Sequence, residues 1–242
     1  SRIARAASDA VVVSIFVNPT QFGNPEDLAK YPDTLAEDLA QLEAAGVDLV
    51  FCPTAAQMYP EGADTIVETP NLAGMLMGAL RPGHFRGVAT VVTKLFNLVQ
   101  PARAWFGQKD YQQVLVIRQM VRDLEIPVEI VAHATVREPD GLAMSSRNLR
   151  LTAEDRAAST ILSQALNAAQ SMATQGATPD QIVEKVSAQI TAEPRATLQS
   201  VDIRGAADLC ELPDAPLASH AVLLLAADFG PVLLIDHAIL TP

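Results

Sequence analysis

The chain has 242 residues, 49% of them hydrophobic and 19% charged, which is typical of one large or two modest globular domains and excludes disordered or collagen-like classes. The formal net charge of -11 argues against nonspecific nucleic-acid binding, which needs an excess of Lys and Arg on one face. The longest apolar run, 221–227, is far shorter than the roughly 20 residues of a membrane helix, so we expect no membrane partner.

The N-terminal part begins with a strand, a helix and a second strand. Residues 11–17 are nearly all apolar and rich in β-branched side chains, which predicts a strand buried on both faces of a parallel sheet. Leucines recur at helical spacing over 35–42, and residues 47–51 then predict another buried strand.

The same alternation continues to about residue 132. Apolar periodicity predicts helices over 88–99 and 114–124, and each is followed by a short strand, at 104–106 and 128–132. Strands that alternate with helices predict an α/β fold with a parallel sheet.

The pattern changes after residue 135. One long helix is predicted over 153–174, and a second begins after Thr178 and Pro179. Three further strands are predicted, with a hairpin turn at 228–231 between the last two: 198–203, 221–226 and 232–235. We therefore expect two domains, 1–135 and 136–242, the second an α+β domain with antiparallel strands.

Polar clusters follow three of the predicted strands, at 18–23, 107–113 and 136–148. Ligands of parallel sheets bind beyond the carboxyl ends of the strands, so we expect the three clusters to share one rim. Residues 81–150 also carry ten basic side chains against six acidic ones, which favours an anion site in this otherwise acidic chain.

The 107–113 cluster suits a phosphate. Gly107 allows close backbone approach, Lys109 supplies a mobile charge, and a helix beginning near Asp110 directs its amides outward. The simpler alternative is a glycine turn with Asp110 as the helix cap. One of Gln112 and Gln113 is expected to face the ligand crevice beyond the carboxyl ends of the strands.

The residues Met144, Ser145, Ser146 and Arg147 place two hydroxyls and a guanidinium on a polar loop between the domains, which suits a polyphosphate. A capping serine in an ordinary loop is the alternative. Arg81 and His84, in a glycine-flanked turn, are weaker candidates for anion binding. The four scattered histidines and two cysteines do not have zinc-site spacing, and no Gly-x-Ser-x-Gly elbow is present.

Six ordered motifs together resemble the pantothenate synthetase (pantoate:β-alanine ligase) family, and the resemblance runs essentially from end to end. The motifs are residues 16–22, Tyr31-Pro32, 58–60, 81–87, 106–113 and 137–148.

The resemblance implies a Rossmann-like parallel-sheet nucleotidyltransferase domain over 1–135, a smaller C-terminal α+β lid over 136–242, and a homodimer. Two cysteines are too few for a disulfide scaffold, so we expect a reducing cytoplasm. The resemblance also implies the reaction. Pantoate attacks the α-phosphorus of ATP, with Mg²⁺ present, to give pantoyl adenylate and pyrophosphate, and the β-alanine amine then displaces AMP. No metal ligand is assigned.

The family pattern also implies residue roles, position by position. Gln21 and Gln113 are expected to bind pantoate, and Lys109, Ser145, Ser146 and Arg147 to be catalytic. The residues expected to line the ATP site are Gly107, Gln108, Lys109, Asp110, Val136, Met144, Ser145, Ser146 and Arg147.

Three departures from the family pattern stand out. Members begin with a further strand and a His-x-Gly-His loop that binds ATP phosphates, and no such motif occurs after Ser1. Gln108 stands where Glu is usual, and Asp33 where a basic residue is common. If the absent segment belongs to the native protein, we expect a working ligase; the alternative is a catalytically defective nucleotide-binding paralogue or fragment.

Overall fold

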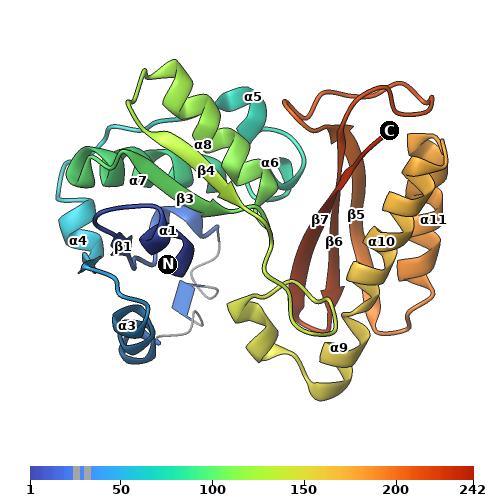
Figure 1. Cartoon of the computed structure of the whole chain (residues 1–242), viewed down its shortest axis with the longest axis horizontal. Helices are drawn as coiled ribbons and strands as arrows, with labels where there is room; N and C mark the ends of the chain where they lie inside the picture. The colour runs from blue at the N-terminus through green and yellow to red at the C-terminus, as the bar shows by residue number, and fades with distance from the viewer. Residues whose placement is uncertain (24–27, 30–33) are drawn as a thin grey trace. The chain divides into compact units, whose positions relative to one another are not determined.

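The computed structural model describes residues 1–23, 28–29 and 34–242, so the Tyr31-Pro32 motif and Asp33 lie outside the described residues. The chain divides into two compact units (Figure 1). Unit 1 comprises residues 1–106 and 116–131, and unit 2 comprises 107–115 and 132–242. The domain boundary expected near residue 135 stays a prediction.

Unit 1 contains nine complete elements among the described residues: α1 (Arg2–Ala6), β1 (Val12–Ser14), η1 (Pro19–Gln21), α3 (Leu35–Ala44), β2 (Leu49–Phe51), α4 (Ala55–Met58), α5 (Pro70–Ala73), α6 (Met77–Leu80) and α7 (His84–Val99). Three elements have residues in both units: β3 (Arg103–Gly107), α8 (Tyr111–Asp123) and β4 (Glu129–His133).

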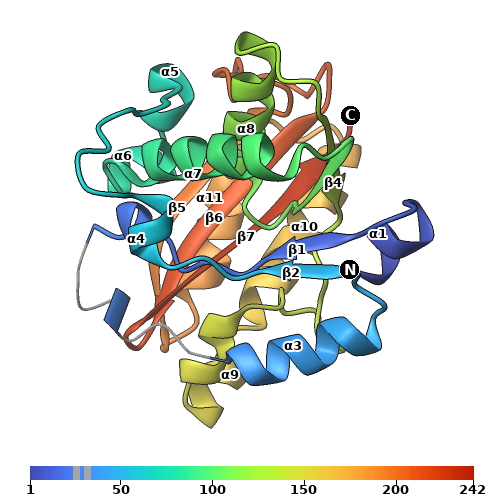
Figure 2. The ribbon, with the colours of Figure 1, turned by 90° about the vertical axis from the view of Figure 1, so that its left-hand side faces the viewer.

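Strands β1 and β2 pair in parallel and lie side by side in Figure 2, with Val13 opposite Val50. The expectation that both strands are buried on both faces is wrong. Val12 is 40% exposed and Leu49 is 54% exposed. The reason is that, in the described part of the chain, β1 and β2 form a sheet of only two strands.

The core of unit 1 forms around α7, whose apolar positions follow the predicted periodicity. Phe85, Val88, Val92 and Phe96 on α7 are buried in one cluster with Ile117 of α8. Gly83 precedes α7 in the left-handed conformation, with φ +81°, which a glycine adopts without strain.

Unit 2 contains the remaining elements among the described residues: η2 (Ser146–Arg150), α9 (Ala153–Ala158), α10 (Ile161–Thr174), α11 (Pro179–Thr191), β5 (Ala196–Gly205), β6 (Ala221–Phe229) and β7 (Val232–Leu240). β5, β6 and β7 form an antiparallel sheet, and α10 and α11 pack against it (Figure 1). The predicted hairpin is present, with Gly230 at φ +57° between β6 and β7.

The single helix predicted over 153–174 is wrong, because the structure breaks it into α9 and α10. Ser159 donates its hydroxyl to the carbonyl of Arg156 at 2.8 Å, and Thr160 donates to that of Ala157 at 2.9 Å. Such hydroxyl-to-carbonyl bonds compete with the helical ladder, and apolar periodicity does not reveal them.

Candidate active site

Lys109 lies in the short connection between β3 and α8. The N–H of Gln108 donates to the carbonyl of His133 at 2.8 Å, which ties the end of β3 to the end of β4. The carbonyl of Asp110 accepts the first helical bond, from the N–H of Val114 at 3.1 Å. Lys109 is therefore held between a fixed strand end and a fixed helix start.

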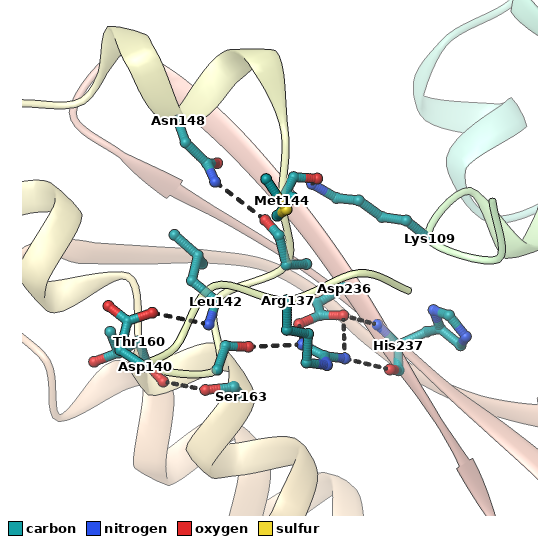
Figure 3. A network of polar contacts seen from close by, with 12 residues as sticks. Lys109, Arg137, Asp140, Leu142, Met144, Asn148, Thr160, Ser163, Asp236 and His237 are labelled. Carbon is teal, nitrogen blue, oxygen red and sulfur yellow. Dashed lines mark hydrogen bonds and ion pairs between the residues drawn. The ribbon is translucent and has the colours of Figure 1, made fainter. Parts of the chain in front are cut away.

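The loop at 143–147 approaches Lys109 within unit 2. The ammonium Nζ of Lys109 lies 3.4 Å from the carbonyl oxygen of Met144 (Figure 3). Partial burial lowers the pKa of Lys109 from its usual 10.5, the negative charges of Asp110 and Asp236 oppose that shift, and the positive charges of Arg147 and Arg137 add to it. The positive charge of Arg147 therefore influences the protonation of Lys109.

The backbone around Met144 forms a small two-stranded arch. Arg137 and Ala143 form an antiparallel bridge, and the N–H of Met144 donates to the carbonyl of Val136 at 2.9 Å. Val136 is 56% exposed and Met144 is 49% exposed, so apolar side chains from both sides of the arch face solvent. A flat apolar ligand such as a nucleobase could pack on them.

The two serines of the loop, Ser145 and Ser146, lie in different environments. Ser145 caps η2, with its Oγ accepting from the N–H of Arg147 at 3.2 Å, as the simpler sequence interpretation proposed. Ser146 is exposed. Arg147 donates to the carbonyl of Leu233 on β7 at 3.3 Å, which fixes the direction of its side chain.

An ion pair joins this arch to β7. Arg137 donates to both carboxylate oxygens of Asp236, at 2.7 and 2.9 Å, and the Asp236 side chain is fully buried (Figure 3). Sequence reasoning missed Asp236. The available signal was a lone acidic residue in the apolar run that forms β7.

The neighbouring His237 is also buried, and its ring centroid lies 5.1 Å from that of Tyr111. Burial lowers the pKa of His237 below its usual 6.5, with the positive charge of Arg137 adding to the shift and the negative charges of Asp236 and Asp110 opposing it. The imidazole is therefore mostly neutral at pH 7, and it adds little positive charge to the surroundings of Lys109 and Arg147.

Unit 1 contains the polar turn that follows β1. Asn18 is buried and donates to the carbonyl of Gly87 at 3.2 Å, while its Oδ1 accepts from Thr20 and Tyr59, both hydroxyls at 2.9 Å. A β-carbon on Gly87 would lie 2.6 Å from the carbonyl oxygen of Thr20, so only glycine allows this approach. The turn is thus rigidly attached to α7.

The carbonyl oxygen of Gln21, in the same turn, lies 3.0 Å from Nδ1 of His84 and 3.5 Å from a guanidinium nitrogen of Arg81. Arg81 and His84 therefore hold the backbone of Gln21. On α8, Gln112 is buried at 5% exposure, whereas Gln113 is partly exposed. Gln113 belongs to unit 2 and Gln21 to unit 1, so each is positioned by its own unit.

Within unit 2, the structure brings together Lys109, Val136 and Met144, which come from two clusters that are separate in the sequence, 107–113 and 136–148. No group of three or more His, Cys, Asp or Glu among the described residues could hold a metal ion. Within the same residues, no helix has the length and apolarity needed to cross a membrane.

The family model described as pantoate-beta-alanine ligase matches residues 1–239. The chain belongs to this family. It is therefore a ligase.

Two relatives illustrate the match, both named pantothenate synthetase. The chain is 54% identical over 238 residues to the Chloroflexus aggregans protein, which covers 98% of this chain and 86% of the relative. It is 50% identical over 239 residues to the Agrobacterium fabrum protein, which covers 98% of this chain and 81% of the relative.

Two solved structures are also similar. Pantothenate synthetase from Thermus thermophilus matches with a TM-score of 0.94 at 46% identity, over 100% of this chain and 87% of that one. Pantoate-beta-alanine ligase from Francisella tularensis, complexed with beta-gamma ATP and beta-alanine, matches with a TM-score of 0.79 at 34% identity, over 98% and 82% of the two chains. These neighbours confirm the α/β nucleotidyltransferase fold class.

Proposed function

We propose that the chain condenses pantoate with β-alanine at the expense of ATP, through a pantoyl adenylate. A pantoate carboxylate oxygen attacks the α-phosphorus of ATP, and pyrophosphate leaves. The β-alanine amine then attacks the acyl carbon, loses a proton, and displaces AMP. The family match over residues 1–239 supports the overall reaction. The comparisons give no support to a catalytically defective paralogue.

The observation that carries the residue assignment is the approach of Lys109 to the 144–147 loop, with its ammonium 3.4 Å from the Met144 carbonyl. Both Lys109 and Arg147 are cations on fixed supports, so they can stabilise charge that grows on phosphate oxygens without costly rearrangement. We assign Ser145 and Ser146 to the same phosphates.

The remaining assignments follow the family pattern. Val136 and Met144 offer exposed apolar side chains and backbone groups to the nucleobase. Gly107, Gln108 and Asp110 flank Lys109 and are assigned to the ATP site, and Gln21 and Gln113 to pantoate. Positioning of the reacting groups then supplies much of the rate enhancement.

Mg²⁺ is proposed to enter bound to the phosphates of ATP. This ion usually keeps several waters and takes only one or two carboxylates from a protein, together with substrate phosphates. That mode of binding needs no cluster of three protein ligands, which agrees with the described residues. We further propose a homodimer, as the family resemblance implies, and a cytoplasmic location, which the low cysteine count favours.

The deciding experiment mixes the purified protein with ATP, Mg²⁺, pantoate and β-alanine, and measures AMP and pyrophosphate. Equal amounts of AMP, pyrophosphate and pantothenate are expected. ATP binding without either product would instead indicate a binding module. Pyrophosphate without AMP after β-alanine addition would indicate a nucleotidyltransferase that stops after the first step.

A further inference from the structure

We propose that Asp236 and Arg137 form a positioning pair that holds the ATP-binding arch of residues 136–144 against β7. Neither residue is assigned contact with substrate. The inference rests on the proposed ATP site, and it adds the element that fixes the shape of that site.

The first support is the geometry of the pair. Arg137 uses two nitrogens to reach the two oxygens of Asp236, at 2.7 and 2.9 Å, so the guanidinium cannot rotate without breaking a bond. Asp236 also accepts from the backbone N–H of His237 at 2.8 Å. Its carboxylate is thereby fixed to β7.

The second support is what Arg137 holds on the other side. Its guanidinium also donates to the carbonyl of Gly141 at 3.0 Å, across the turn of the arch. Arg137 precedes that turn and bridges Ala143, which follows it. One side chain thus fastens both arms of the arch to β7, and the arms end at Val136 and Met144.

The third support is burial. The Asp236 side chain is fully buried, whereas that of Arg137 is 32% exposed. Removing the Asp236 carboxylate from water is costly and offsets much of the attraction to Arg137, so such a pair is weak evidence for a purely stabilising role. A defined orientation for the arch gives the pair a function that apolar packing would not supply.

The fourth support is the electrostatic environment of Lys109. The negative charges of Asp110 and Asp236 raise its pKa, and the positive charges of Arg147 and Arg137 lower it. Asp236 raises the pKa of Lys109 and so favours its protonated form. The buried carboxylate thus holds the arch and favours the charged form of Lys109, while its partner Arg137 opposes the second effect.

The test is Asp236→Asn, which keeps the size of the side chain and removes its charge. We expect the KM for ATP to rise about tenfold or more because the arch is misplaced, while the KM for pantoate is unchanged. We also expect the alkaline loss of ATP binding, measured by calorimetry from pH 7 to 10, to begin at lower pH because Lys109 deprotonates more easily.

Asp155→Asn is the matched control. Asp155 is a largely buried carboxylate in the same unit, 2.8 Å from Arg195, and it does not contact the arch in the described bonds. The Asp155→Asn substitution is expected to lower the melting temperature. It should change neither the KM for ATP nor the pH at which ATP binding is lost on the alkaline side. If Asp236→Asn behaves like this control, the proposal is wrong.

Arg137→Lys covers the case in which Asp236→Asn does not fold. It keeps the positive charge opposite Asp236 but loses the two-pronged contact, so the KM for ATP should still rise selectively. An unchanged KM for ATP in a folded Arg137→Lys protein would overturn the inference. Inactive wild-type protein would instead contradict the proposed function, so the two failures are distinguishable.

Discussion

The Nδ1 atom of His84 lies 3.0 Å from the backbone carbonyl oxygen of Gln21, so the first residue of α7 holds the turn that follows β1. The contact uses the main chain of Gln21, and its side-chain amide takes no part in it. We therefore expect the contact to set where that amide is presented.

His84→Ala should raise the KM for pantoate about threefold to tenfold, because one hydrogen bond that orders the turn is lost. The KM for ATP should change little. Steady-state kinetics with each substrate varied in turn provide the measurement, and His220→Ala, at an exposed position in unit 2, is the control. Equal increases in both constants would contradict the assignment.

Lys109→Ala should lower kcat for adenylation by about 100-fold to 1,000-fold, because its charge matters most as the transition state develops. Pantoate affinity should change far less. Pyrophosphate release in single-turnover experiments measures the first quantity, and calorimetry the second. Arg150→Ala removes an exposed cation from η2 and should leave both unchanged. Comparable losses in both measurements with Lys109→Ala would refute the role.

Affinity for ATP should decline on the alkaline side at a pH below the usual lysine pKa of 10.5. Burial lowers the pKa of Lys109, so the ammonium is fully present below that lowered pKa and is lost as the pH rises through it. Lys109→Arg keeps its charge across this range, and the decline should disappear. A decline that persists in the arginine variant would assign the titration to another group.

Gly107→Ala should raise the KM for ATP about tenfold while leaving the melting temperature unchanged. A β-carbon at Gly107 meets no protein atom within 4 Å, so only a ligand that approaches the backbone could clash with it. Gly23→Ala is the control, since a β-carbon there also meets nothing within 4 Å. Unchanged ATP kinetics would show that the phosphates do not approach Gly107.

Gln113→Ala should raise the KM for pantoate about tenfold, by removing a polar group that the substrate hydroxyls or carboxylate require. The melting temperature should stay constant because Gln113 is partly exposed. Gln119→Ala, on the same helix, removes a side chain that bonds Asp123 and should not affect the kinetics. Unaltered pantoate affinity in Gln113→Ala would remove this residue from the site.

The sequence predicted the helices and strands that carry their own apolar periodicity. The pattern at 88–99 corresponds to α7, and that at 114–124 to α8, because each buries one face in the core of unit 1. The break between α9 and α10 was missed because it depends on the hydroxyls of Ser159 and Thr160 rather than on hydrophobicity.

The sequence placed Lys109 directly after a predicted strand, and the structure has it just beyond β3; its approach to Met144 depends on the fold of the following loop. The supporting pair was not predictable, because Arg137 and Asp236 are far apart along the chain and meet only through the folding of β7. Similarly, the sequence pattern alone could not show that the Oγ of Ser145 accepts a hydrogen bond from the N–H of Arg147.

The partial burial of Lys109 has a consequence for chemical reactivity. An amine whose pKa is lowered has a larger neutral, nucleophilic fraction near pH 8 than an ordinary surface lysine does. Where accessibility is equal, acylating and aldehyde reagents should therefore modify Lys109 more readily than an ordinary surface lysine, and bound nucleotide should shield it. The same burial that favours the neutral amine thus makes its labelling a direct readout of whether the nucleotide site is filled.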